Sequence, residues 1–325
     1  MVDRIVMYTN NFSGKLNMDN LELSKKCRYG YKYYTLKNNR ENGENINLTV
    51  KTKVKYGLRY LSITGSIRKW HFGINGFQDL NRFQFEKVIE QIGLAVCNDK
   101  NALWGFAISQ LEIGINVKLP MALKGISDSY TGFSSFKRMW FEGETSSFIG
   151  TGYTMSVYDK GEEIVAKRKS SNMVSAPIEK LITKATWMRY ELKATKLSKV
   201  PDLKEIANTP GKILGNWNEI LDLFYTKQKQ IVFTPITSPI YTKEFEGKNK
   251  TDLKKYLIYV GMNFIGIPNA MSMAENLKRN KQDARNDLQA IIDLYKDKSE
   301  DKSFDDLRSA IARRIRTLKD FSYAA

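Results

Sequence analysis

The chain has 325 residues, 42% of them hydrophobic, so it can bury a large core and is too apolar to be intrinsically disordered. Its 52 Lys and Arg against 35 Asp and Glu leave a net charge of +17, which favours a polyanionic partner over small neutral substrates. The single histidine, His71, and the two cysteines exclude a Cys/His-rich zinc site and any mechanism that needs two histidines.

The positive charge is uneven along the chain. Residues 1–200 carry 31 basic and 18 acidic side chains, whereas residues 201–325 carry 21 and 17. We therefore expect the nucleic-acid-binding face in the first two-thirds, although a genome whose codons favour lysine would give a similar surplus without such a partner.

Residues 1–200 are predicted to form a β-rich domain. Period-two alternation of apolar residues predicts strands at 2–9, two or three within 46–72, and further strands at 106–118, 137–142, 147–158 and 187–196. A helix is predicted at 83–96, and the charged stretch around Pro177 fits a loop or a helix. The expected fold class is α+β, with a mostly antiparallel central sheet that has helices on one face.

Residues 201–325 are predicted to be helical. Helices are expected over 213–225, from Ser272 with Glu275 in capping-box spacing, and from Ser303, with a proline-bearing connector at 231–242. The last two could form a helix-turn-helix, but two packed helices are the commoner outcome, so this region could contact DNA or another subunit. No internal repeat is evident.

No segment of the sequence predicts a membrane association. The opening residues, MVDRIVMYTN, mix acid and base into an apolar stretch, unlike a signal peptide. The longest apolar run, at 256–268, is too short to span a bilayer. We expect a protein of the bacterial host cytoplasm that does not bind membranes.

Three strands carry isolated polar groups among apolar neighbours. Glu112 lies in the strand around 109–117, Glu191 lies in 188–196, and Tyr158 precedes Lys160 by two residues at the end of a third strand. Because alternate side chains of a strand share a face, the apolar residues predict a core-facing side and these groups predict an open polar side.

Each of these residues also has a purely structural interpretation. Glu112 fits an exposed strand position, and Glu191 has Arg189 and Lys193 beside it for an ion pair. Tyr158 is one of 17 tyrosines, and His71 could stack on the neighbouring Trp70 at a strand end. No single one of these signals specifies a function.

Taken in order, four segments resemble the phage and plasmid replication proteins related to the gene II protein of filamentous phages. The resemblance covers about residues 1–225, and its segments are LSITGSIRKWHFGINGF at 61–77, LEIGINV at 111–117, VYDKG at 157–161 and RYELKATK at 189–196. It implies a rolling-circle replication endonuclease with a replication-endonuclease-like fold, in which a ferredoxin-like palm is one option.

The resemblance also implies residue roles. Tyr158 would attack one phosphodiester of single-stranded origin DNA, leaving a 5′-phosphotyrosine and a free 3′-hydroxyl, and a second transesterification would rejoin the displaced strand. Mg²⁺ or Mn²⁺ would be held by Glu112, Glu191 and His71, and Lys160 would stabilise the tyrosinate or the leaving charge.

One feature departs from related endonucleases, which hold their metal with two histidines from one strand. Here carboxylates, with His71 and Asn116 as further candidates, would have to replace them. No P-loop motif is present, so a host helicase and a host polymerase are the expected partners. The alternatives are a DNA-binding protein without catalysis, and a related transposase or relaxase.

Overall fold

The structure is a computed structural model of the 325-residue chain. It describes residues 1–24, 27–38, 46–55, 58–73, 77–119, 130–133, 138–142, 145–169, 185–233, 249–265, 267–277, 280–295 and 302–320. The predicted loop around Pro177 and much of the connector at 231–242 lie outside the described residues.

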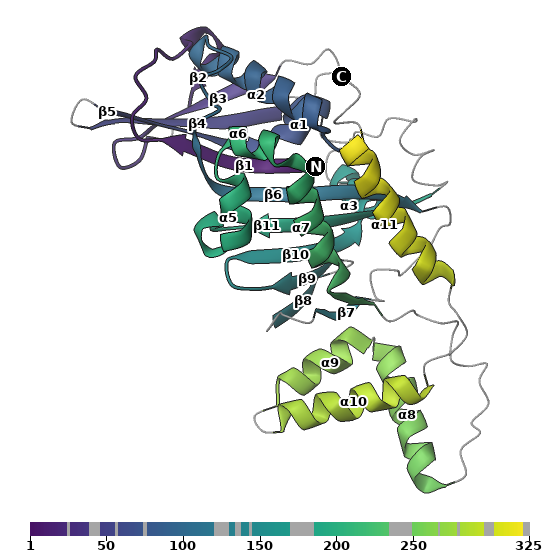
Figure 1. The fold of residues 1–325 in the computed structure, drawn as a ribbon. Coiled ribbons are helices and arrows are strands. Elements are labelled where there is room, and N and C mark those ends of the chain that lie inside the picture. Colours follow the sequence, from purple (N-terminus) through teal and green to yellow (C-terminus); the bar gives the residue numbers. More distant parts are fainter. Residues whose placement is uncertain are drawn as a thin grey trace.

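A ten-stranded antiparallel sheet dominates the described residues, in the order β2-β3-β4-β5-β1-β6-β11-β10-β9-β8 (Figure 1). Its strands are β1 Val2–Thr9, β2 Leu21–Leu23, β3 Lys32–Asn38, β4 Ile46–Lys55, β5 Leu58–Ser66, β6 Ala107–Leu119, β8 Arg138–Glu142, β9 Thr145–Ile149, β10 Tyr153–Asp159 and β11 Thr186–Ala194. Two short strands, β7 Tyr130–Phe133 and β12 Ile231–Phe233, form a separate antiparallel pair. The expected α+β class with an antiparallel sheet is confirmed.

The two halves of the large sheet have the same connectivity. In the first half β1 is followed by β2 to β5, and β5 returns to pair with β1. In the second half β6 is followed in this sheet by β8 to β11, and β11 returns to pair with β6. Because β1 and β6 pair at the centre, the opening strands of both halves lie side by side.

Helices cover one face of the sheet. These are α2 Arg82–Cys97, α5 Pro201–Ala207, α6 Pro210–Gly215, α7 Trp217–Lys229 and α11 Lys302–Asp320, and their apolar residues join one continuous core with the strands. Trp217 Nε1 donates to the Leu318 carbonyl at 3.2 Å and ties α7 to α11. Since these helices share the core of the sheet, the expected domain boundary at 200/201 coincides with no break in packing.

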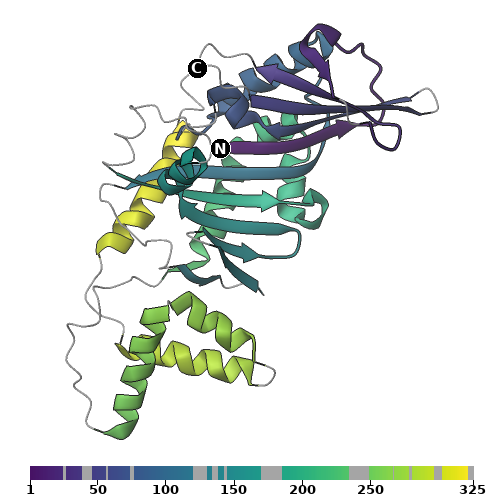
Figure 2. The ribbon, with the colours of Figure 1, turned by 180° about the vertical axis from the view of Figure 1, so that it is seen from behind.

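The opposite face of the sheet is more open. Figure 2 shows the sheet from this side, with α3 (Lys160–Lys169) in front of the strands. Since α3 follows β10 and contacts β11, it covers only the end of these strands. The expectation of helices on one face thus holds for the helices of the main core, with α3 as an addition on the other side.

Three further helices form a smaller core of their own. They are α8 Lys250–Ile265, α9 Ile267–Glu275 and α10 Lys281–Tyr295, and the buried members of this core are Tyr259, Met262, Ala270, Met271, Ile291 and Ile292. Figure 1 shows the group beyond the β7 and β8 side of the sheet, where α9 contacts both strands. In the described part of the chain, no helix is long and apolar enough to cross a membrane.

Several element boundaries differ from the predictions. The alternation expected to continue to residue 72 ends at Ser66, whose Oγ accepts from Lys69 N at 3.1 Å and begins helix α1 (Ile67–Phe72). The single strand expected over 147–158 is two strands, β9 and β10, because Gly152 turns the chain with a φ of 87°.

Two predicted helices also differ. The helix expected over 213–225 is divided into α6 and α7 around Asn216. The helix expected to begin at Ser272 begins at Lys281 instead, because Ser272 lies inside α9 and the chain turns through Asn280 with a φ of 58°.

Candidate active site

The polar face of four central strands carries the candidate site. In β6, Leu111, Ile113 and Ile115 are buried against the helices, so Glu112 and Gly114 point to the open face. The register places Gly114 opposite Glu191 of β11, and Glu191 opposite Ser156 of β10. Strand alternation thus gathers residues from β6, β10 and β11 on one side, as the sequence predicts, and residues of β1 join them there.

Three carboxylates converge there. Asp3, Glu112 and Glu191 each offer an oxygen, and these oxygens all lie within 4.8 Å of one another. Asp3 comes from β1, where the register shifts between Val2 and Arg4. Asp3 was not predicted as a site residue, although its signal was available, since an acid in the opening apolar strand resembles Glu112 in its own strand.

Arg189 binds this cluster from beneath. It is completely buried, and its guanidinium lies 2.5 Å from a carboxylate oxygen of Asp3 and 2.5 Å from Glu191 Oε1. It also donates to Asn116 Oδ1 at 3.1 Å and lies 3.6 Å from Asp79. Two of the three carboxylates, Asp3 and Glu191, therefore already have a cation beside them.

Gly114 makes room for this guanidinium. A Cβ at position 114 would lie 2.6 Å from Arg189 Nη2 and 3.0 Å from Arg189 Cζ. Any other side chain on this strand position would collide with the arginine. A glycine among apolar strand residues marks close approach by another group, and here that group is a side chain of the site itself.

Tyr158 joins the cluster directly. Its hydroxyl donates to Glu191 Oε1 at 2.8 Å, so the phenol touches one member of the acidic group. Burial, followed by the negative charge of Glu191, raises the pKa of Tyr158 well above its usual value. The phenol is thus held as a neutral hydrogen-bond donor in the protein alone.

Lys160 lies next to Tyr158, at the first position of α3. Its Nζ is 5.8 Å from the centre of the Tyr158 ring and forms an ion pair with Glu163, one turn along the helix. Burial lowers the pKa of Lys160 to about 8, because the ion pair with Glu163 offsets only part of the desolvation. The amine can therefore exchange a proton near neutral pH.

The other two carboxylates differ in their titration. Burial, together with the charges of Glu191 and Asp3, raises the pKa of Glu112 from 4.5 to about 7. Burial would also raise the pKa of Asp3, but Arg189, Arg68 and a hydrogen bond from Ser66 together hold it far below its usual value. Glu112 is thus held partly protonated near neutral pH, because burial and its charged neighbours disfavour its carboxylate form.

The donor set fits a hard divalent cation. Three carboxylate oxygens in one cluster are the ligands that Mg²⁺ and Mn²⁺ prefer, and a bound cation would relieve the repulsion that Glu112 experiences. Such a site needs neither a cysteine sulfur nor a histidine nitrogen as a ligand. The alternative is that Arg189 and Arg68 neutralise the group without a metal.

His71 and Asn116 occupy different surroundings from those expected. His71 is on helix α1, where its ring packs edge-on against Phe72 at 4.6 Å, and it is not part of the described carboxylate cluster. Asn116 is buried, and its amide donates to the Phe77 carbonyl at 3.0 Å and to Asp79 at 2.9 Å. Asn116 thus positions Arg189 from the side, and its amide hydrogens are already used.

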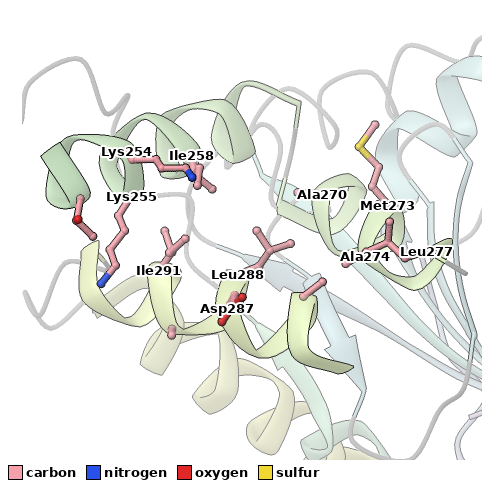
Figure 3. Close-up of a pocket in the computed structure, with 13 residues that line it drawn as sticks. Lys254, Lys255, Ile258, Ala270, Met273, Ala274, Leu277, Asp287, Leu288 and Ile291 are labelled. Atoms are coloured by element: carbon pink, nitrogen blue, oxygen red, sulfur yellow. The ribbon is translucent and has the colours of Figure 1, made fainter. Parts of the chain in front are cut away.

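A separate hollow lies among α8, α9 and α10 (Figure 3), and none of the residues that line it belongs to the carboxylate cluster. Its volume is about 690 Å³, and Ile258, Ala274, Leu288 and Ile291 line it with apolar groups. Lys254 and Lys255 lie on its α8 side. Among the described residues that line the hollow, Asp287 is the one acid, so the lining has no group of acids comparable to the carboxylate cluster.

Comparisons with protein families, with curated proteins and with solved structures found no match to this chain. The case for its function therefore depends on its own residues and on the order of the four sequence segments.

Proposed function

We propose that this protein is a metal-dependent DNA nickase and strand transferase that initiates rolling-circle replication through a covalent bond to Tyr158. The observation that carries the proposal is the 2.8 Å hydrogen bond from the Tyr158 hydroxyl to Glu191, one of three clustered carboxylates. It joins a nucleophile to a set of metal ligands on the open side of the sheet.

The chemistry follows from the position of each group. The phenolic oxygen of Tyr158 attacks the phosphorus of one DNA phosphodiester, and the bond from phosphorus to the 3′ oxygen breaks. Glu191 accepts the phenolic proton. The departing 3′ oxygen takes a proton from Lys160, whose pKa of about 8 suits it to give one near neutral pH. The products are a 5′-phosphotyrosine and a 3′-hydroxyl.

Asp3, Glu112 and Glu191 would hold the divalent cation. When bound, it would supply positive charge beside the scissile phosphate and favour the tyrosinate form of Tyr158. Because phosphotyrosine keeps the energy of the broken bond, a 3′-hydroxyl can later attack it, release Tyr158 and reseal the strand. Nicking and rejoining thus use the same residues in opposite directions.

A second candidate function is DNA binding without catalysis. The ion pairs of Arg189 with Asp3 and Glu191 favour it, because they neutralise the carboxylates without a metal. In that case Tyr158 is a buried structural hydrogen-bond donor, and neither adduct formation nor cation binding would depend on it.

The two candidates are separated by trapping the covalent product. The protein is incubated with Mn²⁺ and a single-stranded DNA pool of randomised sequence, and adducts that survive denaturation are isolated and sequenced. We expect an adduct that requires Mn²⁺, is abolished in Tyr158→Phe, and persists in Tyr153→Phe, which changes the tyrosine at the other end of the same strand. An adduct that persists in Tyr158→Phe, or none in the wild type, would overturn the nickase proposal.

A further inference from the structure

A second group of side chains lies on the same open face of the sheet, over β1, β3, β4 and β5. We call it the tyrosine–lysine platform, and its members are Tyr8, Tyr31, Tyr33, Tyr60, Lys51 and Lys53. Tyr8 and Tyr60 stack with ring centres 6.2 Å apart, and Tyr31 meets Tyr60 edge-on at 5.6 Å. These rings are partly exposed, so they present aromatic surface to the solvent.

Strand register places the platform beside the candidate active site. Tyr8 of β1 is opposite Ser62, Ser62 is opposite Lys51, and Lys51 is opposite Tyr33. Alternate residues of the same strands, such as Val50, are buried against the helices. The platform therefore shares the open face with the carboxylate cluster.

The lysines of the platform have no acidic partners among the described residues. Lys51 Nζ lies 3.8 Å from the centre of the Tyr31 ring, and Lys53 Nζ lies 4.7 Å from the same ring. Lys53 also donates to the Tyr29 carbonyl at 2.9 Å. Two ammonium groups held over tyrosine rings, with no carboxylate paired to them in the described part of the chain, give this surface a positive charge that suits phosphates.

A basic residue connects the platform to the carboxylates. On β1, exposed Arg4 is opposite Glu112 and lies four residues before Tyr8. At about 3.3 Å per strand residue, Arg4 and Tyr8 are separated by about 13 Å along β1. That distance corresponds to about four stacked nucleotides, at roughly 3.4 Å each.

We propose that the platform binds the single-stranded DNA that flanks the phosphate attacked by Tyr158. Tyr8, Tyr31 and Tyr60 stack on unpaired bases, while Lys51 and Lys53 contact the backbone. The inference rests on the proposed function for the identity of the strand, but its binding step needs neither metal nor catalysis. Single strands are the fitting substrate, because the faces of duplex bases are already stacked on each other.

The test measures binding without chemistry. In a Tyr158→Phe background with EDTA, the fluorescence anisotropy of labelled oligothymidylate is titrated with protein, and the same strand is tested after annealing to oligoadenylate. We expect Tyr60→Leu to weaken single-strand binding by roughly tenfold, whereas Tyr60→Phe, which keeps the ring, stays close to its parent. Duplex binding should change much less.

The lysines are tested through salt dependence. Lys51→Ala should weaken binding and reduce the slope of log K against log salt by about 0.7, as expected for one lost backbone contact to a single strand. The matched control is Lys87→Ala on α2, where Lys87 lies 4.2 Å from the partly exposed ring of Phe83 on the helical side. This control should leave both affinity and slope unchanged.

Two results would overturn the proposal that the platform binds single-stranded DNA. One is an unchanged single-strand affinity in Tyr60→Leu with an unchanged melting temperature. The other is a Tyr60→Leu variant that loses single-strand and duplex affinity equally, while Tyr60→Phe binds normally. Stacking on unpaired bases predicts a larger loss for the single strand than for the duplex. Absence of a covalent adduct in the wild-type protein, with single-strand binding intact, would instead count against the nickase proposal alone.

Discussion

The substitution Gly114→Ala tests whether Arg189 lies where the structure places it. The new Cβ would lie 2.6 Å from Arg189 Nη2, closer than side-chain atoms approach. The tip of a flexible side chain could usually move away, but Arg189 is completely buried and held by Asp3 and Glu191. Either the strands separate locally or the guanidinium leaves its carboxylates.

Both responses have a known scale. Overpacking of a core costs about 1–3 kcal/mol, and breaking a buried ion pair costs about 3–5 kcal/mol. We therefore expect Gly114→Ala to reduce the free energy of unfolding by about 3 kcal/mol. The control is Gly105→Ala, because no atom lies within 4 Å of a Cβ there, and it should stay within about 0.5 kcal/mol of wild type.

The measurement is urea unfolding followed by tryptophan fluorescence, with the slope m checked for constancy. A double-mutant cycle with Arg189→Met makes the test specific to this contact. If the clash with Arg189 causes the loss, Gly114→Ala should cost much less in the Arg189→Met background. Additive effects, or a Gly114→Ala variant as stable as Gly105→Ala, would refute the reasoning.

Two further predictions concern the carboxylate cluster and the turn before β10. Because the folded pKa of Glu112 is raised from 4.5 to about 7, the folded state holds a proton that the unfolded state releases between these pH values. The free energy of unfolding should therefore fall as pH rises through this window, by up to about 3 kcal/mol. Thermal melts without added metal measure this pH profile, and Glu112→Gln should flatten it. A wild-type pH profile with no fall would contradict the assignment. Gly152→Ala should lower stability by at least about 1 kcal/mol, since Gly152 has a φ of 87° and the Cβ would lie 2.5 Å from Lys199 Cβ; an unchanged urea midpoint would show that the turn adopts another conformation.

The polar face of the site is the part that local sequence predicted best. In β6 and β11, strict alternation distinguishes Glu112 and Glu191 from their buried neighbours, so their common side follows from the order of the residues alone. The position of Tyr158 on this side of β10 follows from the same argument. The proximity of these groups depends on β6, β11 and β10 being neighbours, which the pattern of a single strand does not contain.

The element boundaries that the sequence pattern misplaces have local causes, which the alternation of apolar residues does not reveal. Residues 67–72 alternate well enough to extend a strand, yet the Ser66 side chain caps a helix there. Likewise Gly152 divides an apparently continuous strand, because a positive φ at one residue reverses the chain. Such events depend on one side chain or one dihedral, whereas periodicity averages over many residues.

The sequence by itself determined the antiparallel α+β class, the basic surplus and the polar side of each central strand, because alternation and charge are properties of neighbouring residues. Only the tertiary structure decided that Asp3 of the first strand joins Glu112 and Glu191, that Arg189 lies among them, and that His71 lies on a helix outside the cluster. For Asp3 and Glu112, the physical reason is the pairing of β1 with β6 at the centre of the sheet. That contact joins residues more than a hundred positions apart, and its register is set by the packing of whole strands against the helices rather than by local preference.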